Sequence, residues 1–294
     1  MREKPTGIGI RIPTTGDVPG RLGIGAMAAA AERSGASSVW TGDHIVFTRE
    51  YTSKYPYSPD GTGRMTWDLE ATYHDTMLSL AMMAAATSRV EVGTAVLVLP
   101  MRNPVEFAKV TASLDVLSGG RLILGLGVGW LAEEFEALGI DFATRGTRFD
   151  EAIEILGRLW SGDETPFTGK AFQLPAGVIS RPLPERGDPP RLLIGGHGRR
   201  TVARARRLGG WLGITQASAP DFEGIEEAIA ALGDREPSFS IVLRVLGPAS
   251  LEPAFVEHHA RLRALGVDLV ILDVPWGTVD EGEDAVAQLV RDLT

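Results

Sequence analysis

Short runs of aliphatic and β-branched residues alternate with longer helical patterns from one end of the chain to the other. Such alternation is typical of parallel strands joined by helices, because a parallel strand needs a crossover connection to reach its neighbour. The strand candidates are residues 7–12, 37–40, 90–97, 122–126, 191–194, 211–214, 239–245 and 268–272. Eight is the number of strands that closes a (β/α)₈ barrel. We therefore predict an α/β fold, a TIM barrel that forms a single domain over residues 1–294.

The segments between the strands carry helix signals. Asn103 precedes Pro104 and Glu106, a combination that predicts an N-cap with a capping box. The glycines at 119–120 predict the end of that helix. Within residues 149–160, apolar side chains recur at helical spacing, so we expect one face of this second helix to pack on the core.

Two stretches interrupt the alternation, residues 41–74 and 130–190. The second holds the helix around 149–160 and a hairpin predicted around 167–174. Both stretches follow the carboxyl ends of predicted strands, where barrel enzymes build their active sites. Connections of this length in a compact domain are usually functional, so we expect insertions that shape the site.

Net charge and cysteine content exclude several classes of function. The 29 basic and 38 acidic residues give a formal net charge of −9, so the chain repels nucleic-acid backbones and anionic lipid surfaces. Cysteine is absent, which excludes a thiol nucleophile and fits a reducing cytoplasm. No apolar run reaches the roughly 20 residues of a bilayer span, and residues 1–5 lead into a strand without a signal-peptide core. We therefore expect a cytoplasmic protein without nucleic-acid or membrane partners.

An acid and an imidazole, Asp43 and His44, follow the second predicted strand. A histidine at the mouth of a barrel can exchange protons with a bound ring near neutral pH. The alternative is that Asp43 caps a loop while His44 packs beneath it. No pair among the five histidines has the spacing of a metal motif, so we expect no metal site.

Glycines and a tryptophan end the fourth predicted strand. Gly125, Gly127 and Gly129 alternate along it and Trp130 follows. Such glycines either let a planar ligand approach the backbone or permit close packing inside a narrow barrel. The run lacks the helix and the acid of a dinucleotide fingerprint.

The fifth predicted strand leads into a glycine turn and then a helix. Gly195, Gly196 and His197 form the turn, and Arg199 and Arg200 open the helix. Free backbone N–H groups and the positive helix end then converge on one point, which predicts a phosphate site. The alternative is a glycine turn flanked by solvated arginines. We infer a phosphate-bearing cofactor or substrate at the barrel mouth.

These segments, in their order and spacing, resemble the bacterial luciferase-like oxidoreductase superfamily, which includes flavin monooxygenases and deazaflavin-dependent reductases. The resemblance covers nearly the whole chain. It is carried by residues 31–40, 42–44, 93–99, 102–104, 117–121, 127–130, 133–135, 145–148 and 194–196. The stretch 55–61 looks like the branch that uses the deazaflavin coenzyme F420.

The resemblance implies an oxidoreductase with a tricyclic ring bound at the carboxyl face of the barrel. In such proteins a non-proline cis peptide lies behind the ring, and here it would join Ala95 and Val96. Asp43 and His44 match the pair that faces ring and substrate, with His44 as the catalytic residue. The residues expected to bind the cofactor are Asp43, Ala95, Val96, Gly127, Gly129, Gly195, Gly196, His197 and Arg199.

Within this superfamily we favour F420-dependent hydride transfer to or from a small organic substrate. The alternative is an FMN-dependent monooxygenase that takes reduced flavin from a partner reductase and reacts with O₂. A lower alternative is a flavin-binding protein without turnover. Trp130 stands where deazaflavin-dependent sugar-phosphate dehydrogenases have a glutamate, which argues against that substrate class. We also expect a homodimer.

Loop residues would line the substrate pocket, and we expect Tyr57, His74 and Trp130 among them, together with Tyr51, Trp67 and Trp276. A phosphate-binding aldolase or isomerase barrel is disfavoured, because none of the four lysines stands at a predicted strand end.

Overall fold

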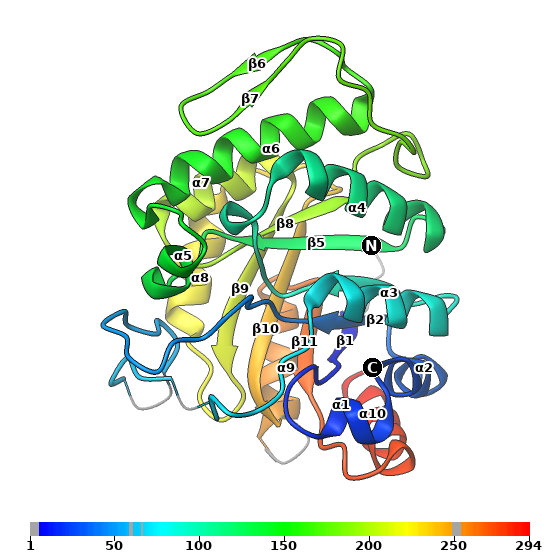
Figure 1. Cartoon of the computed structure of the whole chain (residues 1–294). Helices are drawn as coiled ribbons and strands as arrows, with labels where there is room; N and C mark the ends of the chain where they lie inside the picture. Colours follow the sequence, from blue (N-terminus) through cyan, green and yellow to red (C-terminus); the bar gives the residue numbers. More distant parts are fainter. Residues whose placement is uncertain (1–5, 59–60, 66, 249–253) are drawn as a thin grey trace.

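The main sheet of the protein closes on itself. A computed structural model, drawn in Figure 1, describes residues 6–58, 61–65, 67–248 and 254–294. Its strands follow the order β3-β2-β1-β11-β10-β9-β8-β5-β4, and β3 also pairs with β5. All pairings in this sheet are parallel. With β3 and β4 sharing one position, the result is an eight-stranded parallel barrel, so the predicted TIM-barrel fold is confirmed.

Each predicted strand segment overlaps an observed strand. The barrel strands are β1 (Gly7–Arg11), β2 (Ser38–Thr41), β3 (Glu91–Thr94), β4 (Leu97–Val98), β5 (Leu122–Gly127), β8 (Arg191–Gly195), β9 (Gly210–Gln216), β10 (Ser240–Pro248) and β11 (Leu269–Asp273). The segment 90–97, predicted as one strand, is divided into β3 and β4. The peptide bond between Ala95 and Val96 is cis, as the resemblance implied, and it lies at this division.

Helices cover the outside of the barrel (Figure 1). They are α1 (Val18–Leu22), α2 (Ile24–Arg33), α3 (Thr76–Ala86), α4 (Pro104–Leu117), α5 (Ala132–Ala137), α6 (Arg145–Ser161), α7 (Arg199–Leu208), α8 (Phe222–Leu232), α9 (Phe255–Ala264) and α10 (Val279–Leu293), with 3₁₀ turns at Leu99–Met101 and Phe142–Thr144. The predicted hairpin forms as β6 (Phe167–Thr168) and β7 (Gln173–Leu174), and it lies beyond α6 in Figure 1. No helix in the described ranges is long and apolar enough to cross a membrane.

The predicted helix signals are largely confirmed. The side chain of Asn103 accepts hydrogen bonds from the amides of Val105 (2.9 Å) and Glu106 (3.3 Å) at the start of α4. The predicted reciprocal bond, in which the Glu106 side chain would accept from the Asn103 amide, is not formed. The described cap of α4 consists of the two Asn103 side-chain bonds. Apolar residues of α6 are buried against the core, as the spacing indicated.

The interior of the barrel is filled below its mouth. A buried cluster of Trp40, Ile123, Leu193, Leu212, Val242, Leu269 and Ile271 occupies it. The Trp40 indole needs glycine neighbours, since a Cβ on Gly93 would lie 2.4 Å from its Cζ3 and one on Gly9 would lie 2.6 Å from its Nε1. A cavity lies beyond this filled layer, toward the carboxyl ends of the strands.

The first insertion, residues 41–74, connects β2 to α3. After Thr41, the last residue of β2, its described residues form neither helix nor strand, apart from one isolated bridge between Thr15 and Tyr73. Pro59 and Asp60 of the stretch 55–61 lie outside the described residues. The insertion brings five of its aromatic residues to the barrel mouth, namely Phe47, Tyr55, Tyr57, Trp67 and Tyr73.

Candidate functional site

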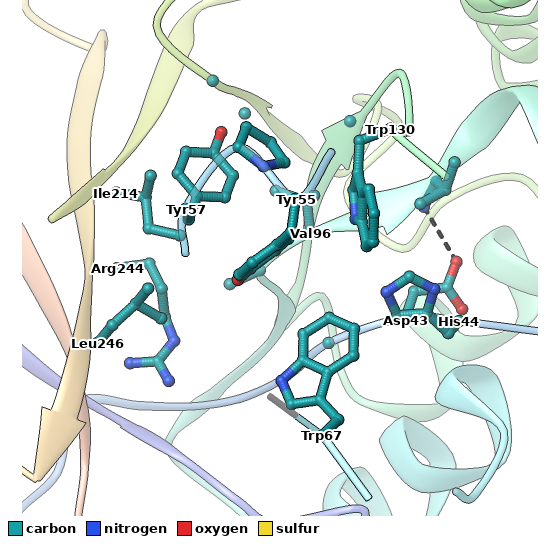
Figure 2. Close-up of a pocket in the computed structure, with 18 of the residues that line it drawn as sticks. Asp43, His44, Tyr55, Tyr57, Trp67, Val96, Trp130, Ile214, Arg244 and Leu246 are labelled. Atoms are coloured by element: carbon teal, nitrogen blue, oxygen red, sulfur yellow. Dashed lines mark hydrogen bonds between the residues drawn. The ribbon is translucent and has the colours of Figure 1, made fainter. Parts of the chain in front are cut away.

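A cavity of about 1050 Å³ opens at the carboxyl ends of the barrel strands. Strand ends form its walls, and the first insertion contributes aromatic side chains, as Figure 2 shows. The structure brings most of the predicted site residues together here. They are Asp43, His44, Tyr57, Ala95, Val96, Gly127, Gly129, Trp130, Gly195, Gly196 and His197, and Trp67 joins them.

Two predicted site residues, Arg199 and His74, lie outside this cavity. Arg199 is exposed at the start of α7 and lines a smaller cavity of about 440 Å³ between α7 and α8. The amide of His74 donates to the carbonyl of Thr14 at 2.9 Å, just before α3 begins. Neither residue is among those that line this cavity, so the substrate-lining role of His74 and the cofactor contact of Arg199 stay predictions.

Tyr51 and Trp276 are likewise not among the residues that line this cavity. Trp276 is buried against α10, where its ring takes the space that a Cβ on Gly282 would need. The hydroxyl of Tyr51 accepts a hydrogen bond from the amide of Met65 within the insertion, at 3.2 Å. Both side chains pack in their own segments, because aromatic residues fill apolar space wherever the fold provides it.

The carboxylate of Asp43 is buried at the edge of the cavity and surrounded by donors. It accepts hydrogen bonds from the Thr76 hydroxyl (2.8 Å), the Val98 amide (3.0 Å) and the Arg102 guanidinium (2.5 Å). Burial raises the pKa of Asp43, and the charge of Arg102 opposes this rise. These bonds tie the end of β2 to α3 and to β4, directly after the cis peptide.

His44 forms a short polar contact with Glu134. Its Nδ1 lies 2.8 Å from Oε2 of Glu134, and Oε1 of the same carboxylate accepts from the amides of Ile45 (2.6 Å) and Val46 (3.2 Å). Glu134 is only 1% exposed, so its carboxylate fixes the ring orientation. A carboxylate only accepts, so Nδ1 carries the proton. Nε2 has no hydrogen-bond partner among the residues that the structure describes, and it is available to a ligand.

Aromatic rings surround His44. The ring centroids of Phe47, Trp67, Tyr73 and Trp130 lie 4.6 to 6.1 Å from the His44 centroid. Tyr55 extends this wall, with its centroid 5.1 Å from that of Trp130 (Figure 2). Such a wall suits a planar ring or an apolar substrate and excludes water from the imidazole.

Tyr55 and Tyr57 reach into the cavity from the insertion. Burial raises the pKa of Tyr57 to about 12 and also raises the pKa of Tyr55. Both hydroxyls are therefore neutral donors at physiological pH.

Val96 explains two of the glycines at strand ends. A Cβ on Gly195 would lie 2.5 Å from its Cγ1, and one on Gly127 would lie 2.7 Å from its Cγ2. For Gly127, this geometry supports close packing, one of the two interpretations that the sequence left open for the glycines of its strand. The Val96 side chain sits on them and forms a ledge inside the cavity, near the centre of Figure 2.

The turn after β8 has the form expected of an anion site. Gly196 has a φ of 118°, which favours glycine, and α7 starts at Arg199 without a side-chain cap. Gly198 and Thr201 line the cavity beside it. The first amides of α7 therefore lack intrahelical partners at a cavity wall.

Burial lowers the pKa of His197, the third residue of this turn. The neutral imidazole is therefore favoured beside the cavity wall.

Sequence reasoning did not assign site roles to several residues at the cavity. Glu134 and Arg102 hold His44 and Asp43, while Arg11, Arg244 and Asp273 line the cavity. One available signal was an arginine inside the apolar run 239–245, since an unpaired charge is rarely buried in a strand. A second was the acid pair at 133–134 directly after the glycine-rich strand end.

Two relatives align over about two thirds of the chain. An uncharacterized protein of Mycobacterium tuberculosis is 39% identical over 186 residues, which is 63% of this chain, and the chain spans 63% of that relative's length. The F420-dependent glucose-6-phosphate dehydrogenase of Kineococcus radiotolerans is 32% identical over 200 residues, covering 66% of this chain and 52% of the relative.

Two solved structures share the fold across nearly the whole chain. An F420-dependent secondary alcohol dehydrogenase, in complex with an F420–acetone adduct, superposes with a TM-score of 0.74 at 18% identity and 99% coverage of both chains. The oxygenating constituent of 3,6-diketocamphane monooxygenase from Pseudomonas putida, with FMN, superposes with a TM-score of 0.70 at 14% identity and 98% coverage of both. At these identities the likeness shows the barrel fold alone. The sequence itself matches the luciferase-like monooxygenase family over residues 11–246, and the chain belongs to that family.

Proposed function

We propose that the protein is an oxidoreductase that binds coenzyme F420 in the 1050 Å³ cavity and transfers hydride between it and a small organic substrate. One observation carries the proposal. A histidine whose Nε2 has no partner among the described residues, the Val96 ledge and the uncapped start of α7 all line one cavity. An F420-dependent relative that is 32% identical supports the choice of cofactor.

The residues present fit a tricyclic cofactor with a phosphate. Gly196, Gly198 and Thr201 at the start of α7 would hold the phosphate, because free amides and the helix dipole favour an anion. Val96 and Ala95 would support the ring, and Trp130 with Tyr55 would cover it. The bound cofactor supplies the hydride donor or acceptor, and the protein supplies orientation and electrostatics.

His44 is assigned the proton-transfer role in this proposal. Its Nε2 exchanges the proton that accompanies hydride transfer at the substrate, while Glu134 keeps the proton on Nδ1. The aromatic rings around His44 exclude water, which strengthens electrostatic interactions at the site.

A second candidate function is an FMN-dependent monooxygenase. The family description and the FMN-bound structural neighbour favour it. It would need a separate reductase to supply reduced flavin and would consume O₂. The stretch 55–61, which resembles the F420-using branch, places F420 first.

Side-by-side titration with F420 and FMN tests the choice. We expect F420 to bind at least about 10-fold more tightly than FMN when both affinities are measured by calorimetry. A Gly195→Leu variant should bind either cofactor more weakly, because the leucine side chain would collide with Val96 and displace the ledge that Val96 forms. Tighter FMN binding, with O₂ uptake coupled to product, would reverse the order of the two candidates.

We also propose that a second copy of the chain covers α3. This helix carries no charged residue, yet Leu78 is 69% exposed and Met82 is 51% exposed. Helix α4, which contacts α3, also exposes the apolar residues Val105 and Val110, and exposed apolar surfaces often mark interfaces.

The double variant Leu78→Glu, Met82→Glu is expected to sediment as a monomer while the wild type sediments as a dimer. Two buried like charges on each α3 would oppose association. Ile179→Glu, at an exposed position in the second insertion, is the control and should remain dimeric. A monomeric wild type in analytical ultracentrifugation would refute the homodimer.

A further inference from the structure

Three charged residues lie in the last interior layer of three adjacent strands. Side chains along a strand alternate between faces, so Arg11, Arg244 and Asp273 share the interior face with Gly9, Val242 and Ile271 respectively. Strand β11 pairs with both β1 and β10, which puts Asp273 between the two arginines. All three residues line the cavity. We call Arg11 and Arg244 the arginine pair.

The arginine pair shares one carboxylate. Nη2 of Arg244 lies 2.6 Å from Oδ2 of Asp273, and Nη1 of Arg11 lies 3.8 Å from Oδ1. Among the described residues, no other carboxylate on the cavity lining forms an ion pair with Arg11 or Arg244. Asp43 pairs with Arg102, and Asp221 and Asp68 accept backbone amides of their own turns. Two guanidinium groups against one carboxylate leave one positive charge in surplus.

The surplus charge resides on Arg11. The Nη1 of Arg244 donates to the backbone carbonyls of Ile271 (3.2 Å) and Val245, so Arg244 is bound into the wall and only 5% exposed. The Arg11 guanidinium, in contrast, has a single polar contact among the described residues, at 3.8 Å from the carboxylate of Asp273. Its side chain remains 26% exposed at the cavity, with donors free for a ligand.

Tyr55 faces the same space. In Figure 2 its hydroxyl end points to the side on which Arg244 lies, whereas His44 and Trp130 lie on the other side. The charges of Arg244 and Arg11 act on this phenol and oppose the rise in its pKa that burial causes. A neutral hydroxyl donor therefore stands in the positive field of the arginine pair.

We propose that the arginine pair and the Tyr55 hydroxyl bind a carboxylate group of the substrate, with Arg11 as the main contact. A guanidinium binds a carboxylate through two parallel hydrogen bonds, and a surplus of one positive charge matches one carboxylate better than a phosphate dianion. Asp273 orients the arginine pair and limits that surplus. The inference rests on the proposed function only where it calls the bound anion a substrate.

The position of this anchor restricts the substrate class. Arg244 and His44 lie on opposite sides of the cavity in Figure 2, and Arg11 lies beside the carboxylate of Asp273 that also binds Arg244. A substrate held at both places carries its reacting carbon away from its carboxylate. We infer an oxo acid or an unsaturated acid in which a spacer separates the two groups.

The test compares an acid with its neutral isostere. 4-Acetylbenzoate and 4-acetylbenzamide are titrated into the protein by calorimetry, with and without bound cofactor. The acid should bind at least about 10-fold more tightly, because charge-assisted hydrogen bonds exceed neutral ones. Arg11→Gln should abolish that preference. Asp273→Asn should strengthen acid binding further, since it removes the competing carboxylate, whereas a purely structural ion pair predicts no such gain.

Arg191→Gln is the matched control, because its pair with Glu91 lies on the surface away from the cavity lining. It should keep the wild-type preference for the acid. Equal affinities for acid and amide, or no saturable binding of the acid, would overturn the proposal. The proposal would also be overturned if the Arg11→Gln variant kept its preference for the acid but lost affinity for the cofactor. If the protein prefers the acid but binds neither F420 nor FMN, the proposed function is refuted while the proposed anion site is retained.

Discussion

Replacement of His44 by alanine is expected to lower turnover by about 100-fold or more while cofactor affinity changes by less than about two-fold. The imidazole lines the cavity with Nδ1 held by the buried carboxylate of Glu134 and Nε2 free. No other described histidine on the cavity lining has this arrangement. Loss of the ring removes the proton-transfer group but leaves the Val96 ledge and the start of α7 intact. Steady-state kinetics and calorimetric titration of the same preparation measure the two quantities separately.

Glu134→Gln extends this prediction to a positioning residue. The side chain keeps its size and can still accept from the Ile45 amide, but it no longer presents a carboxylate to Nδ1 of His44. The imidazole then loses the carboxylate that fixes its orientation and keeps the proton on Nδ1, so turnover should fall by about 10-fold or more while cofactor affinity changes by less than about two-fold. A variant that is merely misfolded would lose cofactor affinity together with turnover. His258→Ala, in α9, is the control for both variants, and near-normal turnover in His44→Ala would remove His44 from the mechanism.

The barrel strands were predictable because most of them are buried on both faces. Such strands form nearly continuous apolar runs, as in residues 122–126, where the observed strand Leu122–Gly127 is buried throughout. The errors arose where backbone geometry departs from the regular pattern. The apolar run 90–97 continues through Ala95 and Val96, and nothing in its composition marks a chain that leaves the sheet between β3 and β4.

The candidate site was only partly predictable, because its contacts join residues that are far apart in sequence. His44 and Asp43 were recognisable beside a strand end, but Glu134 is separated from His44 by 90 positions. The glycines at 127 and 195 were visible as well, although their shared neighbour is the Val96 side chain. Local patterns predict which residues stand at strand ends, whereas pairing across the mouth depends on barrel closure.

A second large effect is expected at the buried pair of Asp43 and Arg102. Replacement of Arg102 by methionine should lower the free energy of unfolding by about 3–5 kcal/mol, because an uncompensated carboxylate would remain in the interior. The Asp43 side chain has no exposure, and Arg102 is its single cationic partner within the described ranges. The Val98 amide and the Thr76 hydroxyl cannot neutralise its charge.

The double variant Asp43→Asn, Arg102→Met separates charge from packing. An asparagine keeps a carbonyl oxygen for Val98 and Thr76 without a charge, so the double variant should be more stable than Arg102→Met alone. Arg191→Met, which breaks an exposed pair with Glu91, should cost less than about 1 kcal/mol in the same urea titration. If Arg102→Met costs no more than Arg191→Met, the Asp43 carboxylate is not held by charge. If the loss is large, the segment after the cis peptide depends on this ion pair, and with it the ledge on which the proposed cofactor rests.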